Sequence, residues 1–369
     1  MALFDKPIAA KKFAEFAKYV RHNNGEIGVK QRGIDLNLNN ACNLKCEHCF
    51  TNSPKGEHFR EVLPPDVVHR ISNEAHDLGI FEYDLQGGEL TLRPKVLYET
   101  LEAIGTERFY MYLTTNGAKL DKKMAKNLKD LGVDRVSVSI DSMDPSVHDQ
   151  FRGEKGSWRK AMNALEYVNS VGIDPYLNIT VGHFNAHSKD VEELCEYSKQ
   201  QGYTTLVNVA TPMGMWHQSD DVMCDEEDTE KLIQHRKKYG NILRNLWNPF
   251  DKNKEAVLGC NTINRLYITP LGDVLPCPYV HIKVGNVYEQ SLKEISDYGF
   301  NIKYFKNNSK LCLAGEDKEF AKKYLSNDGQ SIFNPASPEE IFLENEFVDP
   351  KKMRVKKHTI PIYEQKKQR

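Results

Sequence analysis

The stretch Ile34-Asp-Leu-Asn-Leu-Asn-Asn-Ala-Cys-Asn-Leu-Lys-Cys-Glu-His-Cys-Phe50 joins a short apolar segment to three closely spaced cysteines. Residues 34–38 have the length and apolar character of a strand. Cys42, Cys46 and Cys49 follow at once in the spacing Cys-x3-Cys-x2-Cys. Three thiolates so close together can hold one iron–sulfur cluster and leave its fourth iron without a protein ligand. We therefore expect a metal centre with one open coordination position directly after a strand.

Two other interpretations of this cysteine run remain open. A structural zinc site could take His48 as its fourth ligand, although zinc sites of this kind usually combine two separated pairs of Cys or His. A disulfide scaffold is disfavoured, because a chain of 369 residues with eight cysteines and no apolar secretory leader is typical of a reduced compartment. Ligand type and spacing favour the cluster.

The composition is that of an ordinary globular chain. With 40% hydrophobic residues and a net charge of -2, it can bury a substantial core and is expected to form two domains. Nothing in this charge balance indicates nucleic-acid binding. No apolar segment has the length of a membrane span, and the amino terminus lacks the pattern of a signal peptide. We expect a cytoplasmic protein without a membrane or nucleic-acid partner.

A unit of strand, loop and helix repeats six times in the middle of the chain. Five of the helical connectors end in a glycine, which can adopt the left-handed conformation that terminates a helix. The pattern predicts an α/β fold, a partial (β/α)6 barrel with right-handed crossovers, whose chemistry lies at the carboxyl ends of the strands. The apolar strand segments are 34–38, 81–85, 109–113, 135–140, 175–181 and 205–210.

The cysteine run with its final aromatic residue, Phe50, resembles the cluster motif of the radical S-adenosylmethionine (radical SAM) superfamily. The resemblance implies that Cys42, Cys46 and Cys49 hold a [4Fe-4S] cluster whose open iron binds SAM, and that Phe50 lies near the adenine. One electron from the reduced cluster then breaks SAM to a 5′-deoxyadenosyl radical, which removes a hydrogen atom from a substrate. An electron donor such as flavodoxin or ferredoxin is an implied partner.

The segment Gln86-Gly-Gly-Glu-Leu90 resembles the Gly-Gly-Glu-Pro segment of the same superfamily, with Leu90 in place of proline. Paired glycines allow a close approach of the backbone to a ligand, and a carboxylate can receive the SAM ammonium group. Gly87, Gly88 and Glu89 are therefore predicted to contact SAM. An ordinary turn after the second strand is the alternative.

Four further residues resemble cofactor-lining positions of the superfamily: Asn116, Ser139, Asp141 and Arg152. Ser139 and Asp141 would hydrogen-bond the SAM ribose or carboxylate, and Arg152 would approach the carboxylate. The alternatives are a turn at Asn116-Gly117, a helix cap near Ser142, and a surface ion pair for Arg152.

A second group of cysteines follows the barrel. The segment between Cys260 and Cys277 is predicted to form a β-hairpin that turns near Gly272 and brings the two cysteines to one end. It resembles the auxiliary-cluster domain called twitch in its short form and SPASM in its long form. Only Cys312 is available downstream, so we expect one auxiliary [4Fe-4S] cluster on three cysteines, with its fourth position open or filled by a residue such as Asp317. Buried structural cysteines are the alternative.

Two cysteines remain outside these groups. Cys195 lies in a helical run and is expected to pack in the core. Cys224 follows a loop expected to face the substrate, where its thiol could donate a hydrogen atom to a substrate radical, although an inert cysteine is more common. Trp216 and His217 in that loop are predicted substrate contacts, with ordinary surface residues as the alternative.

These patterns predict five segments. Residues 1–33 form a helical extension that covers the barrel with one apolar face, and residues 34–220 form the barrel itself. A helical connector, an auxiliary-cluster domain and a polar, basic surface tail follow. Their predicted bounds are 221–255, 256–325 and 326–369.

Three hypotheses of function follow. The first is a radical SAM oxidoreductase that acts on a small polar metabolite, such as a sugar, an aminocyclitol or a nucleoside. The second is an enzyme that matures a ribosomally made peptide. The third is a binding scaffold whose cysteines hold structural zinc and which has no enzymatic activity.

Overall fold

The computed structural model describes residues 5–56 and 58–353, and its helices and strands alternate along most of the chain. The helices are α1 Pro7–His22, α2 Pro65–Asp77, α3 Pro94–Ile104, α4 Lys122–Asp130, α5 Pro145–Arg152, α6 Ser157–Ser170, α7 Lys189–Gln201, α8 Glu226–Tyr239, α9 Leu292–Gly299, α10 Lys303–Lys306, α11 Lys318–Tyr324 and α12 Pro338–Ile341. The strands are β1 Gly33–Asn37, β2 Glu82–Gln86, β3 Tyr110–Thr115, β4 Arg135–Ser139, β5 Asp174–Val181, β6 Thr204–Val209, β7 Ile242–Leu243, β8 Arg265–Ile268, β9 Asp273–Leu275 and β10 Gly285–Asn286.

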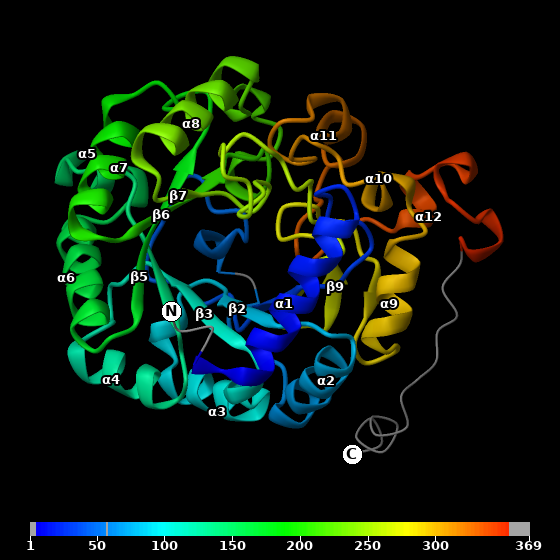
Figure 1. Ribbon diagram of the computed structural model, residues 1–369, viewed down its shortest axis with the longest axis horizontal. Helices are drawn as coiled ribbons and strands as arrows, with labels where there is room; N and C mark the ends of the chain where they lie inside the picture. Colours follow the sequence, from blue (N-terminus) through cyan, green and yellow to red (C-terminus); the bar gives the residue numbers. More distant parts are fainter. Residues whose placement is uncertain (1–4, 57, 354–369) are drawn as a thin grey trace.

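Strands β1 to β6 lie side by side in chain order and are all parallel, so the predicted partial barrel of six β/α units is confirmed. The connecting helices lie outside the strands (Figure 1). Gly105 and Gly202 end α3 and α7 with φ of 70° and 71°, as expected for left-handed C-caps. A short strand, β7, extends the sheet beyond β6.

Alternation along the strands gives the barrel an apolar outer face and a polar interior. Ile34 and Leu36 of β1 belong to the hydrophobic core, whereas Asp35 between them is ion-paired with Arg265 of β8. Arg265 also pairs with Glu82 of β2. Buried charges are tolerated only when they are paired in this way. The barrel interior is therefore a fixed network of charges.

The predicted hairpin is β8 and β9, and it belongs to the barrel sheet. β8 pairs in parallel with β1, from Gly33 opposite Arg265 to Leu36 opposite Ile268. One ten-stranded sheet thus runs through both the barrel and the predicted auxiliary-cluster domain. The boundary predicted at residue 256 separates two groups of helices but does not interrupt this sheet, because the pairing partner lies about 230 residues away, which no local pattern reveals.

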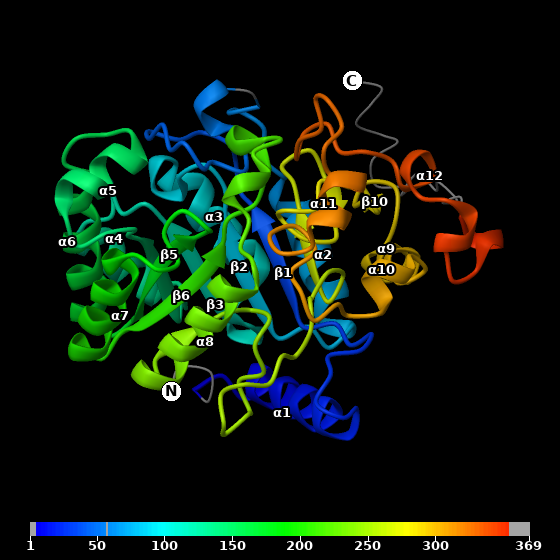
Figure 2. The same cartoon turned by 90° about the horizontal axis from the view of Figure 1, so that it is seen from above.

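The amino-terminal helix α1 closes the barrel at the amino ends of the strands (Figure 2). Phe16 and Val20 on its apolar face pack with Phe81, just before β2. Lys6, just before the helix, donates through Nζ to the carbonyl oxygens of Phe109 and Gly132 at 3.0 and 2.6 Å. The carboxyl ends of the strands are left for the site.

The described part of the predicted polar tail, residues 326–353, is packed against the carboxyl-terminal helices. Phe342 and Phe347 are 4% and 1% exposed. The Phe342 ring lies 4.7 Å from the ring of Tyr324 in α11, measured between centroids. The prediction of a surface tail is therefore wrong for this part, because a few apolar residues anchor an otherwise polar segment. Residues 354–369 of the predicted tail lie outside the described residues.

Substituting Phe342 with alanine is expected to cost about 3–5 kcal/mol of stability, because it leaves a cavity among packed rings. Leu343 offers a matched control, since its side chain is 63% exposed and its replacement by alanine should change stability by less than about 0.5 kcal/mol. Denaturant unfolding of both variants measures the difference. Equal stabilities would show that residues 326–353 are not anchored by Phe342.

Among the described residues, no helix combines the length and the apolar character needed to cross a membrane.

Candidate active site

The first cysteine triad, Cys42, Cys46 and Cys49, lies in the loop after β1, at the carboxyl ends of the strands. All three side chains are partly buried and line one cavity. Burial raises the pKa of the Cys42 thiol to about 12, and the neighbouring Glu89 carboxylate acts in the same direction. Thiolates in this setting need cations beside them, which iron ions would supply.

The spacing of the sulfur atoms distinguishes a cluster from a zinc ion. Thiolates bound to one zinc ion at about 2.3 Å lie about 3.8 Å apart. In neither cysteine triad do all three Sγ atoms come within 4.8 Å of one another. His48, the possible fourth zinc ligand, instead stacks on Phe151 with ring centroids 4.4 Å apart. The geometry fits a group larger than one ion, as an iron–sulfur cluster is.

The cavity beside the first triad is built from the carboxyl ends of the strands and the loops that follow them. The predicted cofactor-binding residues that line it are Phe50, Gly87, Gly88, Asn116, Ser139 and Arg152. Two other predicted contacts, Glu89 and Asp141, do not line it. The structure thus brings most of the predicted SAM-binding residues together around the cysteines.

Gly88 brings the loop after β2 against the loop that carries the cysteines. Its backbone N–H donates to Asn39 O at 2.8 Å. A Cβ atom on Gly88 would lie 2.3 Å from Ala41 O, and one on Gly87 would lie 2.4 Å from Asn39 O. The close approach that the paired glycines permit is therefore to the backbone just before the first cysteine.

Replacing Gly88 with alanine is expected to lower the iron content of the protein, because the added methyl group must displace the Ala41 backbone and with it the cysteine loop. Two four-iron clusters correspond to about eight irons per chain, and we expect about four in this variant. Gly172→Ala is a control for an added Cβ away from the cysteines: it meets no atom within 4 Å, and although the positive φ there strains alanine, the iron content should not change. Iron analysis of both variants after anaerobic reconstitution measures the effect. Full iron in Gly88→Ala would contradict this account of the loop.

The buried Glu89 carboxylate accepts four hydrogen bonds from the protein. Its Oε1 accepts hydrogen bonds from Thr91 N, Thr91 Oγ1 and Thr115 Oγ1 at 2.5–2.9 Å, and its Oε2 accepts from Asn116 N at 2.7 Å. Three of these donors share Oε1, and one uses Oε2. These bonds join the loop after β2 to the end of β3, and they leave an acceptor position on Oε2. The contact of Glu89 with the SAM ammonium group stays a prediction.

Arg152 and Asp141 form a buried ion pair, with 2.6 Å between Nε and Oδ2. Burial alone would raise the pKa of Asp141, but the Arg152 guanidinium lowers that pKa below its usual range. Asp141 also accepts a hydrogen bond from Thr180 N at 3.3 Å. Arg152 is thus held in the cavity wall, 4.0 Å from Cys46 Sγ. Asp141 orients Arg152, its predicted contact with SAM stays a prediction, and the burial of both side chains excludes a surface ion pair.

Asn116 lies at the end of β3 beside the first triad. Its Nδ2 donates to Asn43 Oδ1 at 3.1 Å and lies 4.0 Å from Cys42 Sγ. Ser139 is the last residue of β4 and lines the cavity. Asp144, two residues after Ser142, caps α5 by accepting from Ser146 N. The capping role near Ser142 therefore belongs to Asp144 and leaves Ser139 available to a ligand.

The loop after β6 docks onto the cysteine loop. Met215 N donates to Cys49 O at 3.0 Å. A Cβ atom on Gly214 would lie 2.3 Å from the same oxygen. Trp216 lines the cavity, as a substrate contact should, whereas His217 does not. Only the first of these two predicted contacts is placed where a substrate could touch it.

The second cysteine triad, Cys260, Cys277 and Cys312, lines a second cavity beside the first. The β8–β9 hairpin carries Cys260 and Cys277 at its open end, and Cys312 comes from the segment between α10 and α11. Burial raises the pKa of Cys312 to about 12. Three residues line both cavities: Asn208, Val209 and Tyr279.

An ion pair lies beside the second triad. Arg244 donates to both carboxylate oxygens of Glu316 at 2.8 and 2.6 Å, and Glu316 also accepts from Cys312 N at 2.7 Å. Asp317, the predicted candidate for a fourth cluster ligand, instead caps α11 by accepting from Phe320 N. The carboxylate nearest Cys312 in this network is that of Glu316, and Arg244 holds it.

Cys224, the predicted hydrogen-atom donor, lines neither of these cavities. It is 1% exposed, its thiol lies 3.6 Å from Val181 O, and burial raises its pKa to about 12. We therefore correct its predicted role: Cys224 is a buried core residue, as Cys195 is.

Sequence reasoning missed several residues of the site. Asn178 and Thr180 of β5 and Asn208 of β6 line the first cavity, and Tyr279 and Arg244 line the second. Asn178 and Thr180 alternate with apolar residues along β5, which is the signal that places them inside a barrel. Tyr279 lies in an irregular segment, and Arg244 follows β7, a strand of only two residues, so neither shows such a signal.

Comparison with known families agrees with this geometry. Residues 36–198 match the model of the radical SAM superfamily, and residues 260–314 match that of an iron–sulfur cluster-binding domain, SPASM. The first match contains the first cysteine triad, and the second match contains the second triad.

Curated relatives of this chain have different named activities. A Methanococcus vannielii protein named "Probable GTP 3′,8-cyclase" is 27% identical over 301 residues, which cover 78% of this chain and 99% of that protein. A Methanosarcina barkeri protein named "AdoMet-dependent heme synthase" is 26% identical over 293 residues, which cover 72% of this chain and 81% of that protein.

Solved structures share the fold. Streptococcus suis SuiB, solved with the precursor peptide SuiA, superposes with a TM-score of 0.57 at 18% identity, over 78% of this chain and 68% of that one. The protein anSMEcpe, solved with bound AdoMet, superposes with a TM-score of 0.58 at 19% identity, over 76% of this chain and 83% of that one. The chain therefore belongs to the radical SAM superfamily of [4Fe-4S] and SAM-dependent enzymes and carries a carboxyl-terminal auxiliary-cluster domain of the SPASM type.

Proposed function

We propose that this radical SAM enzyme abstracts a hydrogen atom from a small polar metabolite without phosphate groups and oxidises it. Cys42, Cys46 and Cys49 would hold the cluster that binds SAM, and Cys260, Cys277 and Cys312 would hold the auxiliary cluster. When bound, these groups supply a 5′-deoxyadenosyl radical at one side of the substrate and an electron acceptor at the other. A flavodoxin or ferredoxin is the proposed source of the reducing electron.

We propose that different side chains of the first cavity bind different parts of SAM. Arg152, fixed by Asp141, would receive the carboxylate of SAM through its remaining N–H groups. Asn116 and Ser139 would offer hydrogen bonds to the ribose or the amino acid part, and Phe50 an aromatic surface to the adenine. The Phe50 ring lies 5.1 Å from that of Tyr279, which also lines the second cavity. Substrate bound near Tyr279 would lie between the two clusters.

The proposed substrate class rests on whether the arginines that line the cavities are free to bind phosphate groups. Among the described residues that line the two cavities, the arginines are Arg152, Arg244 and Arg265. Arg152 is the group proposed to bind the SAM carboxylate, and both terminal nitrogens of Arg244 and of Arg265 are paired with carboxylates of the protein. A triphosphate would require free cationic groups. The cavities therefore favour a substrate without phosphate groups over the nucleotide that names the cyclase relatives.

Amide and hydroxyl groups supply the recognition instead. Asn178, Thr180 and Asn208 line the first cavity on neighbouring strands, and Asn208 Nδ2 donates to Asn178 Oδ1 at 2.7 Å. Such groups can pair with both hydroxyl and amino groups of a ligand. A sugar, an aminocyclitol or a nucleoside has this chemistry.

The test is an anaerobic assay of the reduced enzyme with SAM and a panel of sugars, aminocyclitols, nucleosides, nucleoside triphosphates and short peptides. We expect a sugar, an aminocyclitol or a nucleoside to accelerate 5′-deoxyadenosine release and to give a product two hydrogens lighter, both measured by mass spectrometry. Asn208→Leu should slow product formation, whereas substitution of the core residue Cys195 by alanine should not. Turnover of triphosphates alone, or of peptides alone, would refute the substrate class. A product of unchanged oxidation state would refute the oxidation.

A further inference from the structure

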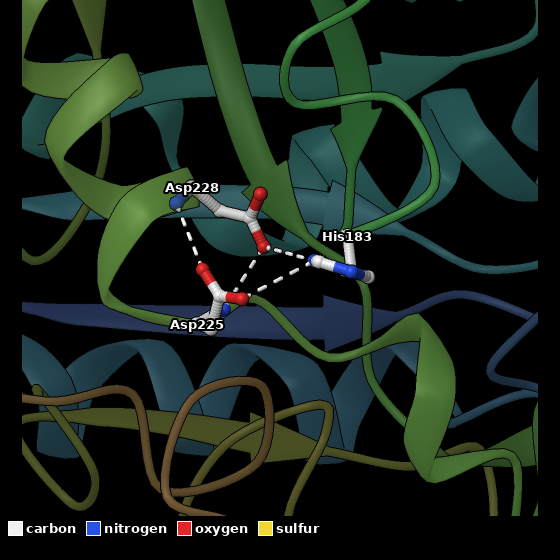
Figure 3. Close-up of side chains that lie close together, drawn as sticks. All are labelled: His183, Asp225 and Asp228. Carbon is white, nitrogen blue, oxygen red and sulfur yellow. Dashed lines mark hydrogen bonds and ion pairs between the residues drawn. The ribbon is translucent and has the colours of Figure 1, made fainter.

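A group of two histidines and two carboxylates lies outside both cavities, near the carboxyl ends of β5 and β6. His183 and His187 belong to the loop between β5 and α7, and Asp225 and Asp228 belong to the start of α8. Figure 3 shows the His183 ring directed between the two carboxylates. None of these residues has a role in binding the clusters or SAM.

The ligand atoms of three members of this group, His183, Asp225 and Asp228, lie close enough together to surround a single small cation. Nδ1 of His183 lies 3.4 Å from Asp225 Oδ2 and 2.9 Å from Asp228 Oδ2, and Nε2 of His187 lies 3.3 Å from Asp228 Oδ1. Nitrogen and oxygen ligands bound tetrahedrally at about 2.0–2.1 Å lie about 3.3 Å apart. In the described part of the chain, His183, Asp225 and Asp228 form the one set of three potential ligand atoms within 4.8 Å of one another.

Asp228 provides a second, independent observation. Its side chain is 1% exposed. Oδ2 contacts Asp225 N at 3.0 Å and His183 Nδ1 at 2.9 Å, whereas Oδ1 accepts no hydrogen bond and has only the ring nitrogen of the exposed His187 beside it, at 3.3 Å. A buried carboxylate oxygen without a hydrogen bond is costly unless a cation lies beside it. The side chains of His183 and His187 are 59% and 55% exposed, so an ion has access from solvent.

We propose that His183, Asp225 and Asp228 bind one divalent transition-metal ion, with Zn²⁺ as a good match to an imidazole and two carboxylates, and that His187 lies beside the second oxygen of Asp228. The ion would link the loop after β5 to the first turn of α8. Phe184 in that loop packs against Trp216, which lines the first cavity, with ring centroids 5.4 Å apart. The site would therefore fix one wall of the cavity entrance. It is independent of the proposed substrate.

The same contacts could instead be ion pairs between protonated histidines and the capping carboxylates of α8. Ion pairing alone predicts no stoichiometric metal binding, so direct metal analysis separates the two explanations. His183→Gln/His187→Gln removes both imidazoles from exposed positions. Asp225→Asn removes a charged ligand and keeps a good N-cap residue for α8. His22→Gln is the matched control, because it removes a histidine from the end of α1, far from this group in the sequence.

The experiment is anaerobic equilibrium dialysis of the reconstituted full chain, with both clusters present, against Zn²⁺, followed by zinc and iron analysis. We expect one zinc per chain in the unchanged protein and in His22→Gln, with the iron content constant. The double histidine variant and Asp225→Asn should bind Zn²⁺ at least about tenfold more weakly, because even residues that only support metal ligands contribute about 10- to 100-fold. Zn²⁺ should raise the thermal midpoint of the unchanged protein and not that of the double variant. Equal zinc in all variants, or none in the unchanged protein, would overturn the proposal.

Discussion

Substituting Cys46 with alanine is expected to abolish SAM cleavage and to remove about half of the iron, from about eight to about four atoms per chain. Two thiolates cannot hold the cluster that three hold, and Cys46 also lies 4.0 Å from the Arg152 guanidinium proposed to bind the SAM carboxylate. Release of 5′-deoxyadenosine should fall to the level of the assay without enzyme. Iron analysis and mass spectrometry after anaerobic reconstitution measure both effects.

The matched control for this prediction is Cys195→Ala. Cys195 is 1% exposed in α7 and belongs to the hydrophobic core, so its loss removes the same atoms without touching either triad. It should keep all of the iron and all of the activity. Cleavage of SAM by Cys46→Ala at the unchanged rate would show that this loop does not hold the cluster that acts on SAM.

The second prediction separates the two clusters. Cys277→Ala should also lose about four irons per chain, yet it should still release 5′-deoxyadenosine, because the first triad and its cavity are intact. Oxidised product should be lost by at least about a hundredfold, corresponding to about 2.7 kcal/mol in the barrier, since the electron left on the substrate has no acceptor. Parallel measurement of 5′-deoxyadenosine and product gives the two rates.

Cys224→Ala is the control for this second variant. Cys224 is buried, with its backbone N–H bonded to Gly315 O at 3.1 Å near Cys312. Its thiol lines neither cavity, so the variant should keep its iron and its product. Loss of product without loss of iron in Cys224→Ala would restore its predicted role as a hydrogen donor. Full product formation by Cys277→Ala would show that the auxiliary triad is not needed for the oxidation.

The barrel could be predicted from the sequence because its signals are local. Each β/α unit shows its own apolar strand, its helix and a terminating glycine such as Gly105 or Gly202. The pairing of β8 with β1 could not be predicted, because it joins segments about 230 residues apart. The packing of residues 326–353 could not be predicted because the segment is mostly polar, and two buried phenylalanines, Phe342 and Phe347, are enough to anchor it.

The candidate site was predictable where the chemistry lies in the residue type and its spacing, as it does for the cysteines. The contacts between side chains of the site were less predictable. Glu89 and Asp141 were predicted as ligand contacts, and the sequence did not reveal that Glu89 is hydrogen-bonded to the end of β3 or that Asp141 is paired with Arg152. Asn178 and Asn208 line the cavity because side chains alternate along a strand. The alternation is visible in the sequence, but it does not show which face of the strand points into the barrel.

The central claim is that this chain holds two clusters and that SAM binds to one of them. Electron paramagnetic resonance of the anaerobically reduced protein, with and without SAM, tests it directly. The account predicts two [4Fe-4S]⁺ signals, of which SAM shifts the one lost in Cys46→Ala and leaves the one lost in Cys277→Ala unchanged. A single cluster signal, or two signals that SAM leaves unaltered, would contradict it.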